Sequence, residues 1–203
     1  MQDIIAGVRT FQRDVYPQYR ERFEKLAAGQ SPVALVITCS DSRVDPFLFT
    51  QAEPGRLFVL RNAGNIVPKY DGIVGGVTAT IEFAVVGLKV PNIIVCGHSQ
   101  CGAIHGLLHP DSLKNMPHVA NWLEHHSDAV RDMMARTGHL GADDEMQHAV
   151  DANVLVQLEH LRAQPCVADA LAKNQINLHG WVYDIVTGTV RAYSTNDEQF
   201  AAL

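Results

Sequence analysis

The chain has 203 residues, of which 47% are hydrophobic and 19% are charged, and its formal net charge is −6. This length and composition are those of a folded domain with a substantial core, and they exclude a disordered chain. The acidic balance offers no basic face for nucleic acid, and no run approaches the roughly 20 apolar residues that a membrane span requires.

The start of the chain and its cysteines indicate a location. The first residues lack the basic segment and the cleavage signature of a secretory signal, so we expect none. The four cysteines are Cys39, Cys96, Cys101 and Cys166. Two of them lie in local patterns with Asp or His, which favours metal ligation over disulfides in a reducing compartment. We therefore expect a cytoplasmic protein.

The first part of the chain predicts helices followed by a strand. Apolar residues recur at helical spacing over residues 3–28, and Pro17 is expected to break this run into two helices. Gly29 and Pro32 then end the helical pattern. Val33–Thr38 has no polar alternation, which is typical of a buried strand.

Two short elements and a longer helix come next. Asp45-Pro46 has the pattern of an N-cap with proline at the first helical position, so it predicts the start of a short helix. Leu57–Leu60 predicts a second strand, and residues 72–88 predict a helix that opens with glycine. Asn92–Cys96 is another apolar run that predicts a buried strand.

The remaining elements are a loop, three helices and a hairpin. Gly97–Gly102 predicts a loop that leads into a short helix over residues 103–108, and two amphipathic helices are expected over about 118–136 and 143–162. His125 and His126, within the first of these two, are expected on its solvated face. Near the end, Thr187-Gly188 separates two strands, a hairpin pattern; the strands are Leu178–Ile185 and Val190–Tyr193.

No internal repeat and no shift in composition divides the chain. We therefore predict one domain over residues 1–203, with an N-terminal helical arm of about residues 1–30. Strands that are separated by helices predict an α/β fold with a central, mostly parallel sheet flanked by helices.

Two segments with metal-ligating residues begin where a buried strand ends. Cys39 follows one strand, and His98 follows the strand that ends at Cys96, with Cys101 three residues further on. Ligands of open α/β sheets bind outside the carboxyl ends of the strands. Thiolate and imidazole suit Zn²⁺, and three such ligands leave a fourth position for water or for an aspartate. Cys96 and Cys166 are interpreted as small buried hydrophobic residues without a role.

Asp41 and Arg43 share the side of the extended segment to which Cys39 points, because side-chain direction repeats every two residues. A bidentate Arg43 would orient Asp41 and keep it ionised, so that it accepts a hydrogen bond from a hydroxide at the fourth position of the metal. Two alternatives remain: the pair is a structural salt bridge, or Asp41 moves onto the metal as fourth ligand in a closed state.

Three motifs occur in order: Cys39-Ser-Asp-Ser-Arg43, Arg61-Asn-Ala-Gly-Asn65 and Gly97-His-Ser-Gln-Cys-Gly102. With them the chain resembles the β-class carbonic anhydrases, in their plant-like branch and at a length typical of bacterial members. The resemblance implies that Cys39, His98 and Cys101 bind zinc and that Asp41 and Arg43 form a catalytic dyad. The implied reaction is the reversible hydration of CO2 to bicarbonate and a proton by a zinc-bound hydroxide.

The resemblance also implies a substrate pocket of five residues: Gln30, Phe58, Ala63, Phe83 and Gly102. The amide of Gln30 would hold a bicarbonate oxygen, and the backbone N–H of Gly102 would donate to the bound anion. Phe58, Ala63 and Phe83 would line a small apolar pocket for CO2. Family members with tyrosine at the place of Phe83 have one more hydroxyl there, so this chain would lack that hydrogen bond.

The family assembly and one regulatory site follow from the same resemblance. The N-terminal helices would embrace a second subunit, so that the active site lies at the interface of a homodimer or higher oligomer. Some members are inhibited by bicarbonate at a secondary site that needs a tryptophan three residues before the first cysteine. This chain has Val36 there, so we expect no such site.

Three alternative functions stay open at this point. Related folds use the same zinc hydroxide to hydrolyse CS2 or COS. A zinc-stabilised scaffold would keep the ligands without catalysis, although it would need neither Asp41 and Arg43 nor Gln30. An active enzyme could also reside inside a microcompartment, with the helices over 118–162 as a docking face.

Overall fold

The computed structural model describes residues 1–72, 75–138 and 144–203. The chain separates into two compact units, Met1–Ser31 and Pro32–Leu203. Within the described residues, no helix is both long enough and apolar enough to cross a membrane.

The first unit is helical from Gln2 to Ala27. It consists of α1 (Gln2–Thr10), the π-helical turn η1 (Phe11–Val15) and α2 (Tyr16–Ala27). The run divides into two α-helices as predicted, and Pro17 lies in the first turn of the second, where a missing N–H costs little. A π turn rather than a loop joins the two helices, and the side-chain amide of Gln18 donates to the carbonyl of Asp14 at 2.8 Å.

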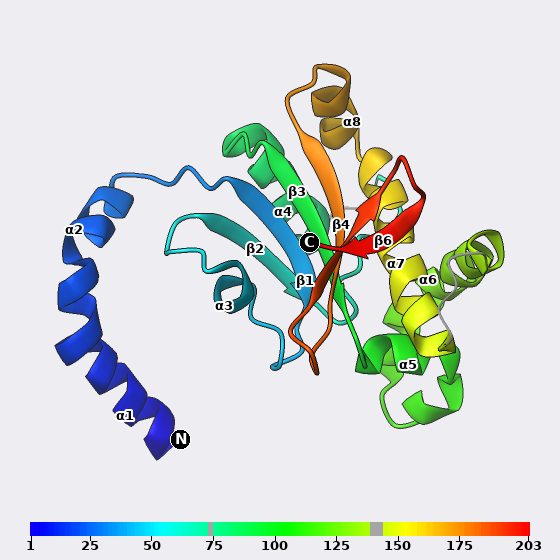
Figure 1. Cartoon of the computed structure of the whole chain (residues 1–203), viewed down its shortest axis with the longest axis horizontal. Helices are drawn as coiled ribbons and strands as arrows, with labels where there is room; N and C mark the ends of the chain where they lie inside the picture. The colour runs from blue at the N-terminus through cyan, green and yellow to red at the C-terminus, as the bar shows by residue number, and fades with distance from the viewer. Residues whose placement is uncertain (73–74, 139–143) are drawn as a thin grey trace. The chain divides into compact units, whose positions relative to one another are not determined.

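The second unit is built on one six-stranded sheet with the order β2-β1-β3-β4-β5-β6 (Figure 1). The strands are β1 (Ala34–Cys39), β2 (Leu57–Asn62), β3 (Asn92–His98), β4 (Asn177–Tyr183), β5 (Val190–Ser194) and β6 (Gln199–Ala202). The first four are parallel, and β5 and β6 are antiparallel additions at one edge. The predicted mostly parallel α/β sheet is confirmed.

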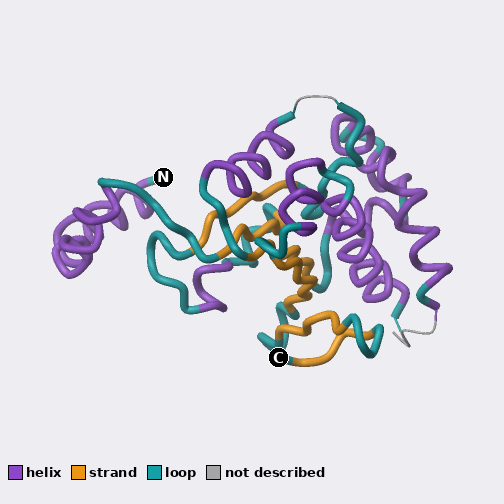
Figure 2. The backbone as a smooth tube through the Cα atoms, turned by 90° about the horizontal axis from the view of Figure 1, so that it is seen from above, coloured by secondary structure: helices purple, strands orange, loops and turns teal. Residues whose placement is uncertain are grey.

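The helices of this unit lie in the connections between the first four strands, and Figure 2 shows them in purple beside the orange strands. They are α3 (Pro46–Thr50), α4 (Gly76–Glu82) with the π turn η2 (Phe83–Gly87), α5 (Gly102–Leu108), the 3-10 turn η3 (Pro110–Leu113), α6 (Pro117–Arg136), α7 (Glu145–Arg162) and α8 (Pro165–Ala172). Asp45 caps α3 as predicted, since its carboxylate accepts from the N–H groups of Phe47 and Leu48. The sequence had not predicted α8 or β6.

Alternate residues of the buried strands face opposite sides of the sheet. On one side Leu35, Ile37, Ile93 and Val95 join the main core with the apolar residues of α4 to α8. On the other side lies a small cluster of strand residues. Within the described chain, Phe49 of α3 is the only helix residue that packs against this cluster. The large core therefore lies on one face of the sheet, and it anchors β1 and β3.

His126 is buried, with 5% of its surface exposed, so the prediction that it lies on a solvated helix face was wrong. It shares a face of α6 with Leu123 and Val130, which are spaced three and four residues away and are buried as well. Its ring contacts those of Trp122 and His160, at centroid distances of 5.6 and 6.0 Å. His125, one position earlier, is exposed as expected.

Candidate metal centre

The sheet brings Cys39 and His98 to the same edge. They are the last residues of β1 and β3, which are parallel neighbours at the centre of the sheet. The chain leaves β1 toward β2 on one side and later crosses to β3 on the other, so the strand order reverses between these two strands. This is the position at which open α/β sheets bind their ligands.

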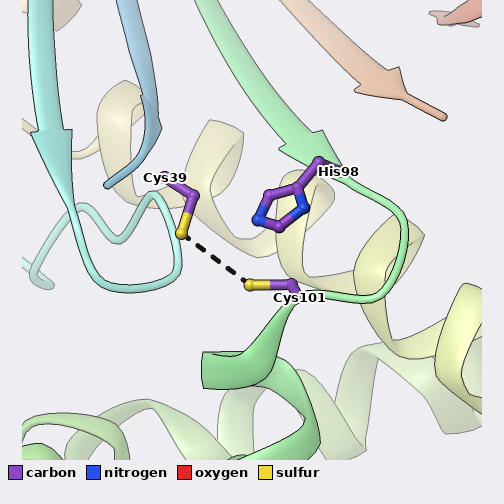
Figure 3. Close-up of side chains that lie close together, drawn as sticks. All are labelled: Cys39, His98 and Cys101. Atoms are coloured by element: carbon purple, nitrogen blue, oxygen red, sulfur yellow. Dashed lines mark hydrogen bonds between the residues drawn. The ribbon is translucent and has the colours of Figure 1, made fainter. Parts of the chain in front are cut away.

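Cys101 completes a cluster at this edge. It caps the start of α5, immediately after the turn that follows β3. One ligand atom from each of Cys39, His98 and Cys101 lies within 4.8 Å of the others, and all three residues are buried. The two sulfurs are 3.9 Å apart (Figure 3). In the part of the chain that the structure describes, this is the only group of three or more potential metal ligands.

The imidazole of His98 is oriented for ligation. Its Nδ1 lies 2.9 Å from the carbonyl oxygen of Ser99. A carbonyl can only accept, so Nδ1 carries the proton and Nε2 keeps a free lone pair. Among the described residues Nε2 has no hydrogen-bond partner although it is fully buried, and a buried polar atom without a partner is costly. A metal ion bound at Nε2 satisfies this atom.

The hydrogen bond between the two thiols shifts their pKa values in opposite directions. A hydrogen bond from Cys101 lowers the pKa of Cys39 against the effect of burial, and the N–H of Gly64 adds to the lowering. The pKa of Cys101 is raised, because it donates to Cys39 and is buried beside the resulting charge. The pair therefore loses its first proton more readily than its second. Thiolate is the form that binds metal, so the donor set fits zinc.

Asp41 is held by Arg43. Nε and Nη2 of Arg43 donate to the two carboxylate oxygens of Asp41 at 3.0 and 2.7 Å, and the Arg43 backbone N–H adds a bond of 2.9 Å. These bonds lower the pKa of Asp41 well below its ordinary value. Oδ2 of Asp41 lies 3.9 Å from Nε2 of His98. The carboxylate is thus next to the ligand cluster but is engaged by Arg43.

Arg61 fixes the loop that carries Asp41. Its Nε donates to the carbonyl of Cys39 at 3.0 Å, and its Nη2 donates to the carbonyls of Asp41 and Val44 at 2.7 and 2.8 Å. Sequence reasoning had placed Arg61 only within a motif. It gave no role to Gly64 either, whose backbone N–H donates to the sulfur of Cys39 at 3.5 Å. A backbone N–H donor of this kind cannot be recognised from the sequence, because every residue except proline has one.

The five residues expected in the substrate pocket lie in different places. Ala63 and Gly102 are chain neighbours of the cluster, since Gly64 contacts Cys39 and Gly102 follows Cys101. Phe58 and Phe83 contact each other, with ring centroids 5.9 Å apart, and Phe83 is 53% exposed. Phe58 lies four residues before Asn62, the partner of Cys39 in the sheet, or about 13 Å along β2. Gln30 is exposed and belongs to the first unit.

Comparison with known proteins shows the family of the chain. The sequence model of the carbonic anhydrase family matches residues 34–190. A carbonic anhydrase of Pseudomonas aeruginosa is 49% identical over 203 residues, which are 100% of this chain and 92% of that protein. The solved structure of the β-carbonic anhydrase CcaA is 44% identical with a TM-score of 0.93, over 100% of this chain and 92% of that chain.

A further solved structure is that of a tetrameric β-carbonic anhydrase from the filamentous ascomycete Sordaria macrospora. It is 32% identical with a TM-score of 0.71, over 94% of this chain and 92% of that chain. The matches extend over the whole chain and include the three motifs that form the centre. The chain therefore belongs to the β-class carbonic anhydrases, and it is an enzyme of that family.

Proposed function

We propose that the protein catalyses the reversible hydration of CO2 to bicarbonate and a proton, at a zinc ion held by Cys39, His98 and Cys101. The observation that carries this proposal is the buried cluster of three ligand atoms within 4.8 Å. Nε2 of His98 has no hydrogen-bond partner among the described residues, and the pKa of the Cys39 thiol is lowered by its hydrogen bond with Cys101.

Three protein ligands suit a catalytic zinc site, which keeps one position for solvent. Bound zinc supplies the acidity that converts a water ligand into hydroxide, with a water pKa near 7 in carbonic anhydrases that have histidine ligands. Two thiolates give the metal more negative charge than imidazoles do. We therefore expect the activity of this enzyme to rise with pH on the alkaline side of neutrality.

Asp41 and Arg43 would control the fourth position. While Arg43 holds both oxygens of Asp41, the carboxylate stays ionised and oriented, so it can accept a hydrogen bond from a protonated oxygen nearby. Asp41 would therefore favour a ligand that carries an O–H group at the fourth position of the metal, and it would disfavour CO2, which has no proton to donate. Without Arg43, Asp41 could turn toward the metal and close the site. The 3.9 Å between Asp41 and Nε2 of His98 is consistent with such a short movement.

The substrate pocket would need a second subunit. Phe58 and Phe83 form an aromatic pair with an exposed ring, but Phe58 lies about 13 Å along its strand from the level of Cys39. Ala63 and Gly102 lie beside the cluster of their own chain. We infer that the aromatic pair of one subunit lines the pocket of the other, while the role of Gln30 stays a prediction from the resemblance. The N–H of Gly102 would then stabilise charge on the bicarbonate oxygens.

The first unit supports the assembly. Five large apolar residues on its helices are more than a third exposed: Ile4, Ile5, Val8, Phe11 and Val15. An amphipathic helix buries such a stripe against a partner. We propose a homodimer or a higher homo-oligomer, and the Sordaria relative is tetrameric. The cytoplasmic or microcompartment location stays a prediction from the sequence.

The test combines metal analysis with stopped-flow CO2 hydration between pH 6.5 and 9. We expect one zinc per chain, activity that rises with pH, and a large loss of activity in Asp41→Ala with zinc retained. Lys173→Ala is a matched control, since it breaks an exposed ion pair with Asp169 at 2.6 Å. A wild-type protein without zinc, or without hydration at any pH, would refute the proposal. Measuring the hydrolysis of CS2 and COS in the same way distinguishes CO2 hydration from the alternative function, a CS2 or COS hydrolase.

A further inference from the structure

One peptide group connects the metal centre to helix α6. The N–H of Gly64 donates to the sulfur of Cys39 at 3.5 Å, and the carbonyl of Ala63 accepts from Nε1 of Trp122 at 2.9 Å. This N–H and this carbonyl belong to the same planar peptide unit, in which they point in opposite directions. Fixing the carbonyl on one side therefore fixes the direction of the N–H on the other.

A second anchor holds the next peptide group. The carbonyl of Gly64 accepts from Nδ2 of Asn153 at 3.1 Å, and Oδ1 of Asn153 accepts from Nε2 of Gln157 at 2.8 Å. Oε1 of Gln157 in turn accepts from the backbone N–H of Val67 at 2.8 Å. Asn153 and Gln157 are 1% and 0% exposed. A buried amide chain with these bonds made is rigid, because breaking any one of them strands a polar group.

Gly64 itself has little freedom to move. Its φ is +81°, a region that favours glycine, and a Cβ built on it would lie 3.2 Å from the Cβ of Ala103 in α5. The loop thus passes close to the helix that starts at Cys101. Two side chains from α6 and α7 and one steric contact with α5 together determine where the Gly64 N–H points.

We propose that Trp122 and Asn153 are positioning residues that aim the Gly64 N–H at the Cys39 thiolate and so tune that ligand. The inference rests on the proposed zinc site. A hydrogen bond to a thiolate withdraws electron density from the sulfur, so the sulfur donates less charge to a bound metal. A metal ion that receives less negative charge from its ligands would be more electron-poor, and it would promote hydration at lower pH.

Trp122→Phe tests this with the metal as reporter. The substitution keeps an aromatic ring against His126 and removes the indole N–H. In protein loaded with cobalt, we expect the sulfur-to-metal charge-transfer band to move to longer wavelength, because the sulfur lone pair rises in energy. The pH midpoint of CO2 hydration should rise by about half a unit, the size expected for one weakened hydrogen bond. Asn153→Ser should shift both quantities in the same direction.

The chain offers a matched control, because it contains two tryptophans. Trp181→Phe makes the same change on the other face of the sheet and should leave the band in place. If Trp122→Phe does not unfold cooperatively, benzothienylalanine at position 122 keeps the shape of the indole and lacks its N–H.

The outcomes separate the two proposals. A cobalt band and a pH midpoint that match the wild type in folded Trp122 variants would show that Trp122 only stabilises the fold, and would overturn the inference. A wild-type protein that takes up no cobalt or zinc would instead refute the metal site.

Discussion

Arg43 and Asp41, two residues apart in one turn, form a two-pronged ion pair at the edge of the metal centre. Arg43 reaches further and donates to the carbonyl of Gln100 at 3.2 Å, in the turn between His98 and Cys101. The guanidinium therefore joins the two ligand-bearing loops as well as orienting the carboxylate. Its loss should affect chemistry more than folding, because its side chain is 46% exposed.

Arg43→Ala should lower kcat/KM for CO2 hydration by about 10- to 100-fold, the range typical of residues that orient the ligands of a metal. The freed Asp41 would compete for the fourth position, so the double variant Arg43→Ala/Asp41→Ala should regain zinc accessibility without regaining activity. Inhibition by a small anion that binds the metal measures that accessibility. Equal activity of Arg43→Ala and the wild type would contradict the assigned role.

Cys101→Ser should abolish stoichiometric zinc binding, since a hydroxyl is a poor replacement for a thiolate ligand. The change leaves His98 and Cys39 in place, and two ligands do not hold the metal against a chelator. Because zinc binds the folded state, the variant should also melt at a lower temperature than the wild type. Zinc content by elemental analysis and thermal melting measure both effects.

Cys166→Ser is the control for this experiment. Cys166 is half-buried and lies outside the cluster, so this variant should keep one zinc per chain. Zinc loss in Cys166→Ser, or zinc retention in Cys101→Ser, would show that the ligands were wrongly assigned.

The clustering of Cys39, His98 and Cys101 could be predicted from the sequence for a specific physical reason. The carboxyl ends of parallel strands meet at one edge of a sheet, so a Cys and a His that follow two buried strands are expected at the same edge. That these two strands are neighbours is shown by the sheet order. The turn from His98 to Cys101 is short enough to add the third ligand. The pair of Asp41 and Arg43 was predicted from the two-residue period of an extended segment, whereas in the structure the two residues meet in a turn that is closed by a hydrogen bond from the N–H of Val44 to the carbonyl of Asp41.

Other features could not be predicted, since they depend on backbone geometry or tertiary packing. Burial of His126 requires knowing which face of α6 meets the core. Asn153 and Gln157 look like solvent-facing polar residues until the loop after β2 is packed on α7. The edge strand β6 has four residues, too few for a period, and α8 is an eight-residue helix whose main sign is Pro165 at its start.

His126 predicts a pH dependence of stability. Burial is the main reason that its pKa is lowered to about 4, and the neighbouring His160 and His125 contribute. In the unfolded chain the ordinary value is about 6.5, so the unfolded state takes up the proton first as the pH falls. The contribution of the neutral His126 ring to the free energy of unfolding is therefore fully present above about pH 6.5. It is lost as the pH falls from about 6.5 to about 4.

The comparison is between the wild type and His126→Leu in urea unfolding at pH 7.5, 6 and 5. The wild type should lose more unfolding free energy than the variant over this range, while the acid sensitivity of the zinc ligands is common to both. His118→Gln, which changes an exposed histidine of the same helix, should follow the wild type. Parallel curves for the wild type and His126→Leu would contradict the assignment.

Arg191 and Asp151 predict a strong non-additive effect. Asp151 on α7 is 5% exposed in its side chain, and Arg191 on β5 donates to both of its carboxylate oxygens at 3.1 and 2.7 Å. Arg191→Met would leave the carboxylate buried with only Gln147, at 2.8 Å, so it should cost about 3–5 kcal/mol. Asp151→Leu/Arg191→Met removes the buried charge and should recover most of this loss. Urea unfolding of Arg191→Met, Asp151→Leu and the double variant gives the coupling free energy of the pair. Additive losses of unfolding free energy would show that the pair does not hold the hairpin to the helix.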